Sequence, residues 1–292
     1  MNMADAPKRI LPAAGASATL RPRPARVDHA RPVSRLVSAL GLLTLAFVVL
    51  PLPFIVLYSF SKSNYALFSS AGFTLDWFRR FFENERFTAA LVNSLMVSVI
   101  TTVAAVLIAL PTALLAVRHR FRGRDLLIGL VSAPLLVPGV ITGTAALSFV
   151  SETRIGTGFW PITAAMICFT LPLVLRPLVA NLSGLDPDLE KAARNLGAGP
   201  RRAFWTITVA QLVPGLVAGG TFAFVEAMDN FSITVFLTNI TTTTLPVEAY
   251  SYIRDIDDPT VAAMATLLIA MSVALVFAIE RVLGLDRFLD MS

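Results

Sequence analysis

Charge is scarce in this chain of 292 residues, because only 15% of them are Asp, Glu, Lys or Arg. A soluble domain has about 25% charged residues, since its surface must be hydrated. Hydrophobic residues make up 55% of the chain, and the mean hydropathy is +0.72. The composition therefore excludes an ordinary water-soluble protein and predicts an integral membrane protein whose remaining surface contacts lipid.

Cysteine and histidine are almost missing. The single Cys168 excludes an intrachain disulfide, and His29 and His119 stand alone in Arg-rich stretches. Neither forms a cluster with the spacing of metal ligands. The chain also has no G-x-x-x-x-G-K-[ST] phosphate loop and no nucleophile beside a base within its apolar runs. We therefore expect no catalytic residue, no metal site and no cofactor in this chain, and an intramembrane enzyme is disfavoured.

Long uncharged runs are abundant. A helix needs about 20 mainly apolar residues to cross a bilayer. Six runs of this kind predict six transmembrane helices, at residues 36–61, 87–117, 126–151, 155–175, 203–225 and 259–279. Residues 230–247 are also uncharged, but their four consecutive threonines and Pro246 predict a loop or a re-entrant segment. The sequence thus predicts an all-α integral membrane protein with about six spans.

The positive charges lie in short stretches between these runs. If the N-terminus is cytoplasmic, 17 Lys and Arg residues lie on that side and six on the other. Cytoplasmic loops are enriched in Lys and Arg, so both termini are predicted to be cytoplasmic. The net charge of +5 then indicates membrane lipid as a partner and no nucleic acid.

The two ends of the chain are predicted to be tails. Residues 1–35 predict a disordered basic tail that contacts anionic headgroups, and residues 286–292 predict a second short cytoplasmic tail. A cleaved signal peptide is disfavoured, because the first apolar run starts too late and is too long.

Residues 74–86 predict a short amphipathic helix between the first two spans. Trp77, Phe78, Phe81 and Phe82 share one face of it. Aromatic rings favour the headgroup region, so this helix is expected to be an interfacial anchor.

The cytoplasmic stretch 183–202 contains a short helix with clear start and stop signals. Asp186 suits the N-cap and Pro187 the first helical position, while Gly197 suits the helix end. Its apolar residues recur at i, i+3, i+4 and i+7 and form one stripe. They are Leu189, Ala192, Ala193 and Leu196. Such a helix suits docking into the groove of a partner, although packing on its own bundle is an equal alternative.

This stretch resembles the EAA loop of ATP-binding-cassette (ABC) importer permeases, whose pattern is EAA-x3-G followed by an apolar segment. Ala192, Ala193 and Gly197 match it. The resemblance implies a coupling helix that docks on an ATPase dimer. It places that contact at Leu189, Glu190, Lys191, Ala192, Ala193, Leu196 and Gly197. One position departs from the pattern: Lys191 stands where the family has Glu, and Glu190 is rotated from it by about 100°.

The resemblance covers about residues 36–285 and is closest to the second permease of spermidine/putrescine-type importers. The matching segments are Asn93-Ser94-Leu95, RFRGR (120–124), PLLVP (134–138), DPDLEKAARNLGA (186–198), TTLPVEAYSYIR (243–254) and DPTVAAMATLLI (258–269). It implies a type I importer permease fold in a bacterial inner membrane, with a sister permease and an extracytoplasmic solute-binding protein. ATP and Mg²⁺ would be bound by the ATPase alone.

The resemblance also implies a polyamine as the solute, while iron, thiamine, phosphonate or an amino-acid-like compound are the alternatives within related permeases. An ion-coupled secondary transporter is disfavoured, because the chain has no internal repeat and no charge within the six runs.

Two acidic residues lie at the outer end of the fifth predicted span. Glu226 and Asp229 are spaced i, i+3, so they share a helix face. Carboxylates at this depth are costly unless they are paired or hydrated. They are candidates to pair with a cationic substrate in its path, but a local pair with Arg254, or a contact with the sister permease, is the preferred interpretation.

Overall fold

The computed structural model describes residues 30–63, 72–186, 188–256 and 258–283, and within them all regular structure is helical. The elements are α1 (Ala30–Val49), α2 (Pro51–Tyr58), α3 (Asp76–Glu83), α4 (Glu85–Arg118), α5 (Arg124–Ser132), η1 (Ala133–Leu136), α6 (Gly139–Glu152), α7 (Phe159–Ser183), α8 (Asp188–Asn195), α9 (Pro200–Ala203), η2 (Phe204–Val209), α10 (Ala210–Asp229), α11 (Thr234–Leu237), α12 (Leu245–Asp255) and α13 (Thr260–Leu283). The predicted all-α class is confirmed.

By length and composition, five helical segments among the described residues can cross a membrane, or six if a bent pair is one span. The first is the uncharged segment Val37–Tyr58. The chain divides into two compact units, residues 1–51 and 52–292. The predicted tail begins outside the described residues, but its last part, from residue 30, is already helical in α1. The tail 286–292 lies outside them entirely.

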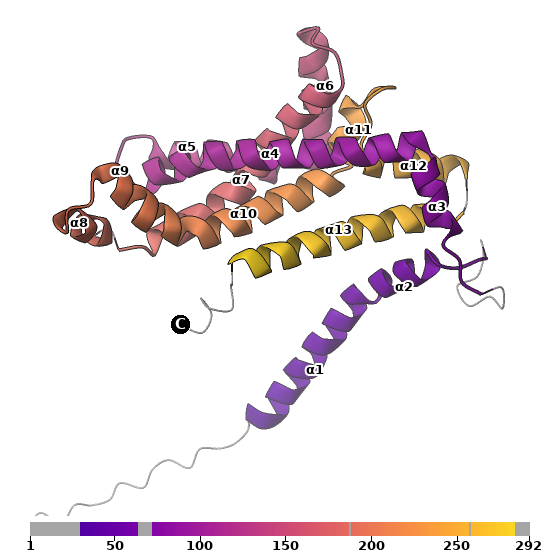
Figure 1. The fold of residues 1–292 in the computed structure, drawn as a ribbon, viewed down its shortest axis with the longest axis horizontal. Coiled ribbons are helices and arrows are strands. Elements are labelled where there is room, and N and C mark those ends of the chain that lie inside the picture. Colours follow the sequence, from indigo (N-terminus) through magenta and orange to yellow (C-terminus); the bar gives the residue numbers. More distant parts are fainter. Residues whose placement is uncertain (1–29, 64–71, 187, 257, 284–292) are drawn as a thin grey trace, which may run out of the picture. The chain divides into compact units, whose positions relative to one another are not determined.

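The centre of the second unit is the packing of α4, α7 and α10, which contact one another along their lengths (Figure 1). Small residues make this approach possible. On α4 the buried positions include alanines spaced by four, and on α10 a buried stripe follows the same spacing. The α10 stripe consists of Gly215, Gly219, Ala223 and Ala227. Small residues let helix backbones approach closely in lipid, where the hydrophobic effect gives no drive for helices to associate.

The third predicted span is not one straight helix. The segments before and after Pro138 form a pair bent by 103° (Figure 1). Val137 is extended and Pro138 has a φ of −53° and a ψ of 136°, so the helical backbone stops there. Proline has no N–H to donate and disfavours helical geometry in the residue before it. The run 126–151 was uncharged throughout, and that property cannot reveal a bend.

Two other spans are longer than their uncharged runs. Helix α7 continues through Arg176 to Ser183, because the Arg176 side chain is exposed and does not have to be buried. The fifth span, from Pro200 to Asp229, contains the π-helical segment η2 before α10. π-helical turns are uncommon and frequently occur at functional sites.

Helix α3 packs on the protein with part of its aromatic face. Trp77 and Phe81 are buried, and the Trp77 Nε1 donates a hydrogen bond of 2.7 Å to the Ser61 carbonyl. The Phe81 ring stacks on Phe87 of α4 with the ring centroids 5.9 Å apart. Phe82 is exposed. The helix is also shorter than the predicted 74–86, since Asn84 ends it and caps α4 by accepting a hydrogen bond from the Arg86 N–H at 2.9 Å.

The close crossing of α10 and α7 gives a test with a matched control. A Cβ on Gly219 would lie 2.8 Å from the Val174 Cα, which forces the backbones apart, whereas a Cβ on Gly220 would meet only methyl groups at 3.7 and 3.9 Å. We expect Gly219→Ala to destabilise the protein by about 1–3 kcal/mol through overpacking. Gly220→Ala should be neutral or slightly stabilising. Thermal unfolding in detergent measures both, and equal midpoints for the two variants would contradict this packing.

Candidate functional site

The segment around α8 connects α7 to the fifth span, and its turn chemistry sets where the helix begins and ends. The Asp186 carboxylate accepts a hydrogen bond of 2.9 Å from the Asp188 N–H, as an N-cap does. At the other end Gly197 has a φ of +93°, a left-handed conformation suited to glycine. The Ala198 N–H donates to the Ala193 carbonyl at 3.1 Å and closes the end of the helix. Both sequence signals thus define a short, rigid helix.

The apolar stripe of α8 faces away from the bundle. No residue of α8 is buried, and the Leu189 and Leu196 side chains are 45% and 90% exposed. Ala192 is exposed as well, and Ala193 is half-buried. Of the two placements left open by the periodicity, the structure therefore excludes a stripe that is covered by the chain's own helices. A leucine this exposed indicates a surface for a partner when it lies beside other apolar residues.

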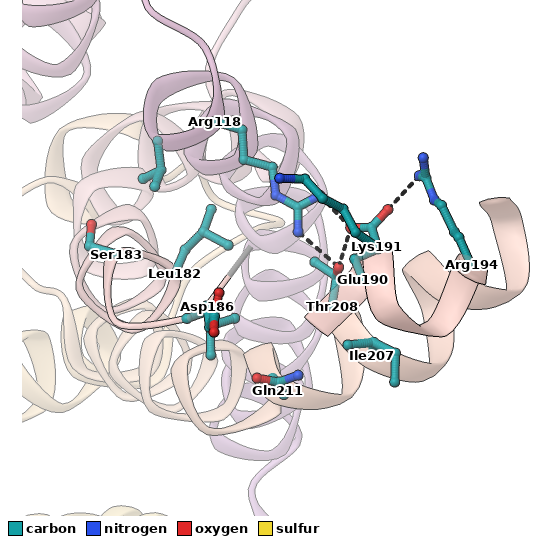
Figure 2. Close-up of a pocket in the computed structure, with 12 residues that line it drawn as sticks. Arg118, Leu182, Ser183, Asp186, Glu190, Lys191, Arg194, Ile207, Thr208 and Gln211 are labelled. Carbon is teal, nitrogen blue, oxygen red and sulfur yellow. Dashed lines mark hydrogen bonds and ion pairs between the residues drawn. The ribbon is translucent and has the colours of Figure 1, made fainter. Parts of the chain in front are cut away.

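The polar side of α8 is attached to the bundle through one carboxylate (Figure 2). Arg118, the last residue of α4, donates through Nη1 to the Glu190 Oε2 at 2.8 Å. Thr208 in η2 donates to the same oxygen at 2.8 Å, and Arg118 donates through Nη2 to the Thr208 Oγ1 at 2.8 Å. Arg194, one turn along α8, donates to the Glu190 Oε1 at 2.6 Å. We call Glu190, Arg118, Thr208 and Arg194 the Glu190 network.

Glu190 is charged at neutral pH although its side chain is only 12% exposed. Burial alone would raise its pKa. The hydrogen bonds from Thr208 and Arg118, together with the charges of Arg118 and Arg194, nevertheless hold the pKa of Glu190 below its ordinary value. Three elements, α4, α8 and η2, thus meet at one ionised carboxylate.

Lys191 has a different environment, although it is the next residue. Its Nζ lies 2.7 Å from the Asp188 carboxylate, and both side chains are more than two-thirds exposed. The hydrogen bond to Asp188 raises the pKa of Lys191. An exposed pair of this kind contributes little to stability. The two neighbouring charges therefore have separate roles: Glu190 contacts the bundle and Lys191 contacts water.

A pocket of 480 Å³ separates α8 from the helices behind it. The Glu190 network forms its polar part, and Leu182, Ser183 and Gln211 line the side formed by α7 and α10 (Figure 2). Helix α8 packs closely on η2 and α9.

Glu226 and Asp229 lie on α10, in the last turn of the helix. Glu226 is half-buried and accepts a hydrogen bond of 2.8 Å from the Asn230 amide, while Asp229 is exposed. Among the described residues neither carboxylate forms a salt bridge, so a local pair with Arg254 has no support. Asp229, at the end of a transmembrane helix, thus has no oppositely charged partner in the part of the chain that the structure describes.

The segment after α10 is fastened by two residues of α4, a contact that no sequence signal predicts. The Asn93 amide donates to the Thr243 carbonyl at 3.1 Å, and the Ser94 hydroxyl accepts from the Leu245 N–H at 2.8 Å. Two separate motifs, Asn93-Ser94-Leu95 and the stretch from 243, are therefore in contact. In this stretch, predicted as a loop or re-entrant segment, the structure has the short α11 followed by irregular backbone.

Comparison with known proteins agrees with this architecture. Residues 105–285 match the family described as "binding-protein-dependent transport system inner membrane component". The chain belongs to this family. It is a permease subunit of an ABC importer, and the resemblance inferred from its motifs is confirmed.

Two curated relatives and one solved structure illustrate how much of the permease is shared. This chain is 28% identical over 231 residues to the spermidine/putrescine transport system permease protein PotC of Haemophilus influenzae, and the match covers 79% of this chain and 90% of the relative. It is 30% identical over 236 residues to the putrescine transport system permease protein PotI of Escherichia coli (78% and 83%). A chain of a bacterial ABC transporter that imports alginate superposes with a TM-score of 0.64 at 16% identity, over 87% of the permease and 97% of that chain.

The contact between Ser94 and Leu245 gives a second test. Ser94→Ala leaves the buried Leu245 N–H without its partner, which costs about 1–3 kcal/mol. Ser98 is the matched control, because it is equally buried one turn further along α4 and its hydroxyl donates to the Ser94 carbonyl of its own helix. We expect Ser94→Ala to lower the unfolding midpoint in detergent clearly more than Ser98→Ala does. The reverse order would contradict the fastening role.

Proposed function

We propose that this permease and a sister permease form the path by which a polyamine, such as putrescine or spermidine, enters a bacterial cell. The path crosses the inner membrane, and both termini of the permease lie in the cytoplasm. A separate ATPase dimer binds ATP and Mg²⁺ and hydrolyses the ATP, and an extracytoplasmic binding protein delivers the solute. The two named relatives support the choice of substrate, because each is a polyamine permease and the match extends over most of both chains.

The exposed stripe of α8 is the observation that supports coupling to the ATPase. In this proposal the docking surface consists of Leu189, Lys191, Ala192, Ala193, Leu196 and Gly197, and Glu190 takes part in the coupling from the opposite side of the helix, where it holds α8 to the bundle. The two alanines keep the surface low, so a groove in the partner can approach the helix backbone. Leu196, as the most exposed of the apolar residues, supplies the largest area to bury. Lys191 supplies an accessible positive charge at the edge.

Glu226 and Asp229 are proposed to contact the substrate. A polyamine carries several positive charges, and Asp229 is an exposed carboxylate with no salt bridge among the described residues. Glu226 lies one turn earlier on the same helix and is oriented by Asn230. A carboxylate near the end of a membrane helix is stabilised by a cation that pairs with it. Two such groups suit a substrate with amines separated by a short carbon chain.

The docking surface can be tested by adding a charge to it. Leu196→Asp places a carboxylate in an interface that would otherwise bury a leucine, and we expect it to reduce co-purification of the ATPase by at least about tenfold, since burying an unpaired charge costs several kcal/mol. Asn195→Asp is the control, because it adds the same charge on the same helix but about 100° away from the stripe. Equal ATPase recovery with both variants would show that the stripe is not the docking surface.

The substrate contact can be tested by removing one charge. Asp229→Asn should lower spermidine uptake at subsaturating concentration by roughly fivefold at unchanged protein level, because a partly exposed ion pair contributes about 1 kcal/mol. Asp255→Asn, which neutralises another exposed carboxylate at the end of α12, should leave uptake unchanged. Uptake of radiolabelled spermidine by cells expressing the whole transporter measures both. Unchanged uptake with Asp229→Asn would remove Asp229 from the path.

A further inference from the structure

The attachment of α8 to the bundle depends on very few contacts. None of its side chains is buried, and a pocket of 480 Å³ lies between it and the helices α7 and α10. Helix α8 packs on η2 and on its neighbour α9, but no side chain of α8 is buried in these contacts. Its polar connection to α4 and η2 is the Glu190 network.

Two properties suit this network to transmit movement. First, Glu190, Arg118 and Thr208 are all hydrogen-bonded to one another, and each of the three bonds is 2.8 Å long, so their relative positions are fixed. Second, the network joins two of the three helices that pack together in the core. Arg118 ends α4, and Thr208 lies in the π-helical segment that leads into α10 (Figure 2). A displacement of α8 therefore acts on both helices at once.

The π-helical segment is the place where the start of α10 can bend in response to such a displacement. Thr208 is buried within it, and its hydroxyl bonds outward to Glu190 instead of to its own helix. Thr206, two residues earlier, does the opposite: its hydroxyl donates to the Arg202 carbonyl one turn before it. Segments of this kind are local irregularities in a helix, and helices bend at them.

We propose that Glu190 is a positioning residue that transmits movement of the coupling helix to α4 and to the start of α10 through Arg118 and Thr208, while Lys191 and the apolar stripe contact the ATPase. This inference rests on the proposed coupling to an ATPase. It assigns the two neighbouring charges of α8 to different partners. Loss of the network should therefore separate ATP hydrolysis from transport without preventing assembly.

The test compares uptake with hydrolysis in the complete transporter. The permease, its sister permease and the ATPase are reconstituted in proteoliposomes with the binding protein and spermidine, and spermidine uptake per ATP hydrolysed is measured. We expect Glu190→Gln to lower this ratio about tenfold, because it weakens the interactions with Arg118, Arg194 and Thr208 together. Thr208→Val should lower it about threefold, because the ion pairs of Glu190 with Arg118 and Arg194 remain. Thr208→Ser keeps the hydroxyl and should restore the ratio.

Two controls separate transmission from a general loss of structure. Thr206→Val removes a hydroxyl of the same segment that bonds only to its own helix, and Asp125→Asn neutralises an exposed carboxylate in α5. Both should leave the ratio unchanged. The inference is overturned if Glu190→Gln leaves the ratio unchanged, which includes a proportional fall of uptake and hydrolysis. It is also overturned if Thr206→Val lowers the ratio as much as Thr208→Val.

A second measurement does not depend on transport. A spin label at Asn195→Cys, in a Cys168→Ser background, reports the mobility of α8 in the permease alone. Glu190→Gln should increase that mobility, and an unchanged spectrum would overturn the network's role. If wild-type proteoliposomes show no ATP-dependent uptake, the proposed function fails, and the spin label still decides whether Glu190 holds α8.

Discussion

The fold depends on the close approach of α10 to α7. In lipid the hydrophobic effect does not drive helices together, so their association needs contact between surfaces that fit closely. Gly219 provides it, since its Cα faces the backbone at Val174 with no room for a side chain. Gly215 repeats the arrangement one turn earlier, against the Pro177 carbonyl and Asn181. Helix α10 is thereby held along its length and not at one point.

This constraint matters because α10 connects the two candidate sites. The segment η2, which carries Thr208 and so contacts Glu190, leads directly into α10, and Glu226 and Asp229 are in its last turn. In the proposed function, this makes α10 the most direct connection between the ATPase side and the substrate side of the permease.

The sequence predicted the helical class, most of the spans and the start and end of α8, because each depends on local properties. Uncharged length defines a span, and Asp186 and Gly197 define the ends of a short helix through backbone chemistry that involves only neighbouring residues. It did not predict the size of the bend at Pro138, the π-helical segment or the extension of α7 past Arg176. Those depend on whether neighbouring helices satisfy a broken backbone or leave a charged side chain exposed.

Contacts between distant segments were beyond prediction for the same reason. Nothing in the composition of Asn93 and Ser94 indicates that they hold residues 243 and 245, and nothing near Glu190 indicates that Arg118 is its partner. The sequence treated Glu190 as a displaced version of the family's glutamate, with Lys191 as the anomaly. In the structure, Glu190 accepts hydrogen bonds from Arg118, Arg194 and Thr208 within the chain.

The two acidic positions differ in one respect that bears on function. Glu190 accepts hydrogen bonds from two arginines and a threonine, so it has little capacity left for a ligand. Asp229 has no salt bridge to any described residue and is exposed at the end of a transmembrane helix, where an unpaired charge is unfavourable. A carboxylate that is satisfied within the chain stabilises one arrangement of helices. A carboxylate without a salt bridge in the chain remains available to a cation from outside it, which is the property that the proposed site for a passing polyamine requires.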